Sequence, residues 1–142
     1  MYNLSKRSKE NLKGVHPLLV KVIENAIINS PVDFTVVCGV RTKEEQTELY
    51  RQGRVKDGQI VTYIDGINKK SEHQVKEDGY GYAVDIYPFF DGKVQVNHED
   101  TVKSLQLIAL HIKLCSHVMG VEVVWGGDWK KLKDYPHFEL KI

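Results

Sequence analysis

A chain of 142 residues with 42% hydrophobic and 27% charged residues has the composition of one globular domain, which excludes a disordered protein. The formal net charge is only +1, so the composition gives no indication of nucleic-acid binding, and no nucleic-acid partner is expected. No run of 18 apolar residues predicts a membrane-spanning helix, and we expect a single domain over residues 1–142 with no membrane partner.

The N-terminal segment, residues 1–30, is predicted to be helical. Apolar residues recur with helical spacing across positions 12–26. Because a proline belongs in the first turn of a helix, we expect the main helix to begin near His16 or Pro17 and to end at Ser30. The start of the chain has no apolar signal-peptide core, so we expect synthesis in the cytoplasm without a signal peptide.

The next elements are a strand, a helix and a hairpin. Residues 34–40 are rich in β-branched residues and predict a strand. Thr42 and Glu45 form the capping box of a helix that runs to about Gly53. In the polar, glycine-rich stretch that follows, residues 60–64 and the Asp-Gly pair after them predict a hairpin.

The second half of the chain predicts further strands around a long helix. Residues 83–89 form a strand, and an Asp-Gly turn leads into residues 93–96. Asp100 is the expected N-cap of the long helix, which Gly120 ends. Two further strands are expected at residues 121–125 and 137–140. This order predicts an α+β fold in which helices pack on an antiparallel sheet.

The two cysteines, Cys38 and Cys115, lie in apolar stretches and have no Cys-x-x-Cys spacing. We interpret both as buried free thiols, as is typical of a protein made in the cytosol, although the sequence alone leaves a disulfide between them open. His111 precedes Cys115 by one helical turn, but no third ligand accompanies the pair, so we expect no metal there.

Strand alternation places metal-capable residues on the face of the sheet that points away from the core. Within residues 137–140, the apolar side chains share one face and leave His137 and Glu139 on the other. Within residues 83–87, the same alternation separates Asp85 from its apolar neighbours. A bare carboxylate in such an apolar strand is costly to bury unless it is paired or bound to a metal.

His73, in the loop before this strand, completes a candidate ligand set with Asp85 and His137. Two imidazoles and one carboxylate form the kind of set that holds catalytic zinc, with water in the fourth position. Zinc lowers the pKa of such a water to about 7. Asp134, three residues before His137, is placed to reach that water as a general base. From spacing alone, the alternative is that each histidine is an ordinary exposed residue.

Several ordered motifs resemble one known family. They are Ser71-x-His73, Gly81-x-Ala83-x-Asp85, Asp134-x-x-His137-x-Glu139, Gly39-x-Arg41-Thr42 followed by Gln46 and Leu49-Tyr50, and Trp125-Gly126-Gly127-Asp128-Trp129. Together they are similar to the motifs of zinc D-Ala-D-Ala carboxypeptidases and L-alanyl-D-glutamate endopeptidases, a family that includes phage endolysins. The similarity spans about residues 34–140 and implies a small α+β fold with a zinc cofactor.

The resemblance also implies roles for individual residues. His73, Asp85 and His137 would ligate zinc, and Asp134 would be the general base. Arg41 would stabilise the oxyanion or hold the substrate, since a guanidinium can meet developing negative charge.

Three further features concern the surroundings of the ligands. The resemblance implies that Ser71 hydrogen-bonds substrate and that Glu139 supports a ligand histidine. Residues 74–80 lengthen the spacing between His73 and Asp85 beyond the family's usual one, and we expect this insertion to reshape the substrate cleft.

The implied function is that of a phage-type endolysin. It would cut the L-alanyl-D-glutamate bond of peptidoglycan stem peptides, acting as a monomer on the cell wall after release through a holin-type pore. A D-alanyl-D-alanine carboxypeptidase or dipeptidase built on the same metal site is the alternative among enzymes. A non-catalytic wall-binding module is the alternative outside them, and the presence of Asp134 argues against it because a binder needs no base.

Overall fold

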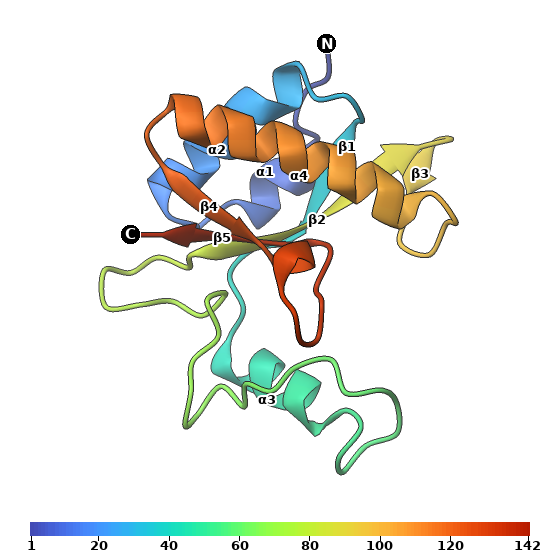
Figure 1. Ribbon diagram of the computed structural model, residues 1–142. Coiled ribbons are helices and arrows are strands. Elements are labelled where there is room, and N and C mark those ends of the chain that lie inside the picture. The colour runs from blue at the N-terminus through green and yellow to red at the C-terminus, as the bar shows by residue number, and fades with distance from the viewer.

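An antiparallel sheet forms the centre of the computed structural model, which describes residues 1–142 (Figure 1). The main strands lie in the order β1-β2-β5-β4, and β3 pairs with β2. Every pairing between these strands is antiparallel. The strands are β1 Phe34–Cys38, β2 Ala83–Phe90, β3 Lys93–Val94, β4 Glu122–Trp125 and β5 His137–Lys141.

Three of the four α-helices gather on one side of this sheet (Figure 1). The helix α3 lies apart from them, on the other side, together with the long connection to β2. The helices are α1 Lys6–Asn11, α2 Pro17–Ile28, α3 Lys43–Arg51 and α4 Thr101–Val118, and a short 3-10 turn, η1, covers Gly126–Asp128. The α+β prediction is therefore confirmed.

The hydrophobic core lies between the sheet and the helices α2 and α4. Its fully buried side chains come from both layers and include Leu19, Ile23, Val84, Ile86, Ile108, Ile112 and Phe138. The alternation predicted for β2 and β5 is confirmed, because their core residues leave Asp85 and His137 on the opposite face. That face is the one on which α3 lies, because residues of α3 line one cleft together with Asp85 and His137.

The hairpin predicted at residues 60–64 is wrong. This part of the α3–β2 connection contains no strand, because its polar groups bond to side chains instead of to a partner strand. Gln46 Nε2 donates to the carbonyl of Ile64 over 2.8 Å, and Asp65 accepts backbone N–H groups from three following residues. These contacts fold the segment as a loop around α3.

The N-terminal prediction is confirmed in part. The main helix α2 begins at Pro17 with His16 as its N-cap, but residues 6–11 form the separate helix α1. Gly14 separates the two helices with a φ of 80°, and Val15 makes an isolated bridge to Gly81. No helix in the structure is long and apolar enough to cross a membrane.

Two details of the helix ends and the cysteines differ from expectation. The capping box of Thr42 and Glu45 is present, but Asp100 stands at the N-cap of α4 without a side-chain cap bond. Cys38 and Cys115 are both free thiols, and both are half-buried instead of fully buried. Cys115 lies 3.7 Å from His111, whose Nε2 already contacts the carbonyl of Ala26.

Candidate metal centre

Strand register brings the candidate ligands into one row across the sheet. Asp85 of β2 pairs directly with His137 of β5, and on its other side with Cys38 of β1. His73 approaches from the loop before β2, where its carbonyl oxygen accepts the backbone N–H of Arg41 over 2.8 Å. The loop is thereby fixed against the end of β1, and the histidine ring lies over Asp85.

Three donor atoms of this row converge on one point. His73 Nε2 lies 3.3 Å from Asp85 Oδ1 and 3.2 Å from His137 Nδ1, and the remaining separation, between His137 Nδ1 and Asp85 Oδ1, is 3.6 Å. Bonds of about 2.0–2.2 Å in a tetrahedral zinc site separate donor atoms by about 3.3–3.6 Å. The three atoms therefore have the spacing of a metal ligand set.

Hydrogen bonds hold the other ring nitrogens of both histidines. His73 Nδ1 lies 2.8 Å from the carbonyl oxygen of Gly39, and His137 Nε2 lies 2.7 Å from Glu139 Oε1. Because a carbonyl or a carboxylate can only accept, each of these nitrogens carries the proton. The lone pairs of His73 Nε2 and His137 Nδ1 then face the common point, as a metal requires.

The Asp85 carboxylate is the electrostatic centre of the site. Its Oδ1 atom is buried and has no hydrogen-bond partner of good geometry, which is costly for a charged oxygen unless a cation binds it. Burial opposes ionisation, but His137 and His73 outweigh it and hold the pKa of Asp85 well below its usual range. Burial lowers the pKa of both histidines, but the Asp85 carboxylate outweighs it. The pKa of His73 is thereby raised to about 10, and the pKa of His137 is also raised. The negative charge of Asp85 therefore attracts a cation to this point.

Arg41 holds the second oxygen of Asp85. Its Nη2 atom lies 3.3 Å from Asp85 Oδ2, and its Nη1 atom donates to Gln46 Oε1 over 2.8 Å. Gln46 is 1% exposed and belongs to the motif that begins at Gly39. The one signal for it in the sequence is its place in that motif, because the burial of Gln46 is seen only in the structure.

Asp134 lies at the rim of the ligand set. Its Oδ2 atom is 3.9 Å from His137 Nδ1, and 42% of its side chain is exposed. Burial, followed by the charge of Asp85, raises the pKa of Asp134 above its usual value. A carboxylate near the ligands, with a raised pKa and access to solvent, has the properties of a general base.

Ser71 and Cys38 contact the ligand loop. Ser71 Oγ accepts the backbone N–H of His73 over 3.1 Å, so it shapes the turn that carries this ligand. Cys38 Sγ lies 4.0 Å from His73 Nδ1, and Cys38, His73 and Asp85 form a second metal-capable group. That group fits less well, because His73 Nδ1 already donates to Gly39.

The convergence point opens into a cleft of about 530 Å³. Residues from α3, from the α3–β2 connection, from the sheet and from the β4–β5 loop line it, among them Tyr63, Tyr87 and Trp129. The ring centroids of Trp129 and His137 are 5.0 Å apart, whereas Trp125 packs in the core. The two tryptophans of one motif thus have different environments.

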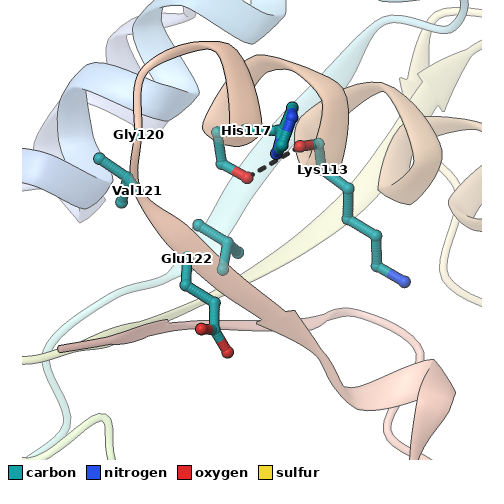
Figure 2. A pocket seen from close by; sticks show the side chains of 7 residues that line it. Lys113, His117, Gly120, Val121 and Glu122 are labelled. Carbon is teal, nitrogen blue, oxygen red and sulfur yellow. Dashed lines mark hydrogen bonds between the residues drawn. The ribbon is translucent and has the colours of Figure 1, made fainter.

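A second hollow, of about 390 Å³, lies where α4 ends and β4 begins (Figure 2). Lys113, His117 and Glu122 are among its lining residues, and Ser116 Oγ donates to the carbonyl of Lys113 within it. No group of three metal-capable side chains lies there. The chemistry of the molecule is therefore concentrated in the larger cleft.

Comparison with known proteins points to the same chemistry. A family model described as "Phage L-alanyl-D-glutamate peptidase" matches residues 1–141. The peptidoglycan L-alanyl-D-glutamate endopeptidase CwlK of Bacillus subtilis (strain 168) is 36% identical over 131 residues, which cover 89% of this chain and 73% of CwlK. The L-alanyl-D-glutamate peptidase of Escherichia phage T5 is 28% identical over 142 residues, covering 99% of this chain and 90% of that protein. Among solved structures, the L-Ala D-Glu endopeptidase ChiX of Serratia marcescens matches 98% of this chain and 90% of its own, with a TM-score of 0.76 and 34% identity.

Proposed function

The chain belongs to the phage L-alanyl-D-glutamate peptidase family, and on this premise we propose that it is a zinc-dependent endopeptidase that hydrolyses the L-alanyl-D-glutamate bond of peptidoglycan stem peptides. One observation carries the proposal: His73 Nε2, Asp85 Oδ1 and His137 Nδ1 converge with the spacing of a zinc ligand set, and Asp134 stands beside them. The choice of the L-alanyl-D-glutamate bond follows the relatives, which are L-alanyl-D-glutamate peptidases.

The ligand residues fit zinc in number and in kind. Two imidazoles and one carboxylate are a common catalytic set that leaves one position open, and the buried Oδ1 atom of Asp85 has no hydrogen-bond partner. When bound, zinc supplies the Lewis acidity that activates water and polarises the scissile carbonyl.

Asp134 is the proposed proton carrier. Its carboxylate is near enough to the ligand set to take a proton from the attacking water and exposed enough to deliver that proton to the leaving amine. The raised pKa of Asp134 supports the first step, because a base that holds its proton more tightly is a better acceptor at neutral pH.

Arg41, Glu139 and Ser71 have proposed supporting roles. Arg41 orients Asp85 through Oδ2 and lines the cleft, where its charge is placed to stabilise negative charge on the substrate carbonyl. Glu139 fixes the ring of His137, and Ser71 shapes the turn of His73 while lining the cleft beside the substrate.

The proposed place of action is the cell wall of a bacterium. A peptidoglycan peptide is the substrate, and the protein works as a monomer that reaches the wall by a route such as a holin-type pore. This part of the proposal follows the relative from Escherichia phage T5, an L-alanyl-D-glutamate peptidase.

Mass analysis of digested muropeptides tests the proposed reaction. The expected products carry a new N-terminal D-glutamate, and 1,10-phenanthroline abolishes their release until zinc is added back. The Asp134→Asn variant serves as the matched inactive protein. Release of free D-alanine with the alanyl-glutamate bond intact would identify a carboxypeptidase instead, and intact muropeptides in every sample would favour a wall-binding module.

A further inference from the structure

The cleft contains two cationic side chains that no group of the protein neutralises. Lys69 and Lys131 both line it, and both residues are exposed. Neither ammonium group takes part in an ion pair or a hydrogen bond, in contrast to Lys76, Lys113 and Lys133 nearby.

The other charges around the cleft are paired within the protein. Arg41 binds Asp85, and Glu139 binds His137. Glu72 Oε2 lies 2.7 Å from Lys76 Nζ. On the β4–β5 loop, Asp128 pairs with Lys113. Apart from the proposed base Asp134, the unpaired charge that remains in the cleft is therefore positive.

Two separate loops supply these lysines. Lys69 belongs to the α3–β2 connection, and Lys131 belongs to the β4–β5 loop. Figure 1 shows that both loops extend to the side of the sheet on which α3 lies. Each lysine has a lysine neighbour, Lys70 or Lys130, that is also exposed but does not line the cleft.

The chemistry of the proposed substrate calls for a cation in this cleft. In an L-alanyl-D-glutamate bond, the glutamate contributes its amine, so both of its carboxyl groups lie on the leaving side. The continuing peptide uses one of them, and the other remains a free carboxylate next to the scissile bond.

We propose that Lys69 and Lys131 bind this free carboxylate and thereby select an acidic residue on the amine side of the scissile bond. The inference rests on the proposed function, because the carboxylate is defined by the bond that is cut. Lysine suits the role, since its flexible stem places a point charge without requiring a fixed geometry.

The two lysines are substrate-binding residues, and their expected effect is modest. An exposed ion pair contributes about 0.2–1 kcal/mol, which corresponds to about a 1.4- to fivefold change in binding for each lysine. Two such contacts together change kcat/KM by roughly tenfold. The effect weakens as salt rises, because exposed charges are screened.

The experiment compares two synthetic stem peptides that differ only in the free carboxylate of D-glutamate, which is intact in one and amidated in the other. We expect the wild-type protein to cleave the carboxylate peptide with a kcat/KM about tenfold higher, chiefly through KM. The Lys69→Gln and Lys131→Gln variants lose this preference in part, and the double variant loses it fully. The Lys70→Gln and Lys130→Gln variants, which make the same charge change outside the cleft, keep it.

Each result has one interpretation. Equal cleavage of both peptides by the wild type, or equal losses on both peptides in the variants, overturns the lysine proposal and leaves the proposed function intact. Loss of the preference in the control variants also overturns it, because a general surface field would then be responsible. If the wild type opens the alanyl-glutamate bond of neither peptide, the proposed function fails and the lysine assignment fails with it.

Discussion

At the scale of single residues, the two histidines of the site present different ring nitrogens to the same point. His73 uses Nε2 because the carbonyl of Gly39 holds its Nδ1, and His137 uses Nδ1 because Glu139 holds its Nε2. The partner of each histidine therefore decides which lone pair is available, so these partners belong to the proposed metal site as much as the proposed ligands do.

Removing the charge of Glu139 tests this reasoning. We expect Glu139→Gln to weaken zinc binding by about 10- to 100-fold, because the amide holds the His137 ring less firmly and makes it a weaker donor. Competition with a fluorescent zinc chelator measures the affinity. Glu122→Gln removes the same charge from the neighbouring strand β4 and should bind zinc like the wild type. Equal affinities in the two variants would show that Glu139 does not act through the metal.

The ligand and the base are expected to separate cleanly by mutation. His137→Ala removes one of three ligands and should yield protein without stoichiometric zinc. Asp134→Asn keeps the shape of the side chain and leaves all three ligands, so the zinc content should match the wild type. Turnover should fall by about 10²- to 10⁴-fold, the usual contribution of a general base. Atomic absorption and muropeptide turnover measure the two quantities, and equal zinc loss in both variants would contradict the assignment.

At the scale of elements, close packing explains Gly126, the glycine that directly follows the first tryptophan of the motif. A Cβ atom added at Gly126 would overlap the carbonyl oxygen of Asp134 and lie 3.0 Å from the Cβ atom of His137. The backbone N–H of Asp134 also donates to the carbonyl of Gly126 over 3.0 Å. The 3-10 turn η1 therefore packs directly against the Asp134–His137 turn and helps to fix its position.

Gly126→Ala should consequently disturb the site. We expect reduced zinc content together with lower stability, because the turn that carries Asp134 and His137 has to move. Gly79→Ala is the control: its φ of 88° makes alanine unfavourable by about 1 kcal/mol, but the added Cβ meets no atom within 4 Å. Zinc content and thermal unfolding of both variants provide the measurement. Full zinc occupancy in Gly126→Ala would show that the turn adapts without cost to the site.

The elements also show which features a sequence can reveal. Periodicity predicted α2, α4 and the alternating strands, because burial of an apolar face determines these patterns locally, and the capping box of Thr42 and Glu45 predicted α3. Alternation in β2 and β5 also predicted that Asp85 and His137 share a face, and the register across the two strands agrees. The loop at 60–64 was mispredicted because its conformation depends on Gln46, a residue of another element.

Within the site, the contacts between residues far apart in the chain could not be predicted from the sequence. The bond between Arg41 and Asp85 joins residues that are 44 positions apart, and only the folded register brings them together. The unpaired state of Lys69 and Lys131 likewise depends on where every acidic side chain lies. Sequence spacing can indicate candidate ligands, but which charged side chains form ion pairs depends on the tertiary structure.

At the scale of the whole molecule, a bound metal would join segments that the chain keeps far apart. The loop before β2 contributes His73, the sheet contributes Asp85 and His137, and the cleft lies between α3 and the sheet. Because the unfolded chain cannot assemble these ligands, metal binding should stabilise the native state by mass action. The gain is about 2.7 kcal/mol when free zinc is 100-fold above its dissociation constant.

Removal of the metal should therefore lower the melting temperature of the full chain by on the order of 10 °C, given the usual entropy of unfolding for this size. This difference in melting temperature should grow as pH rises from about 6 to 8. Despite burial, the Asp85 carboxylate raises the pKa of His73 to about 10, so a metal has to displace a proton from His73. That displacement costs less free energy as the pH increases. Thermal unfolding with EDTA and with added zinc, at several pH values, measures both effects. His137→Ala is the control and should respond little to either addition. A melting temperature that zinc leaves unchanged in the wild type would mean that the three converging donors do not bind a metal in the folded protein.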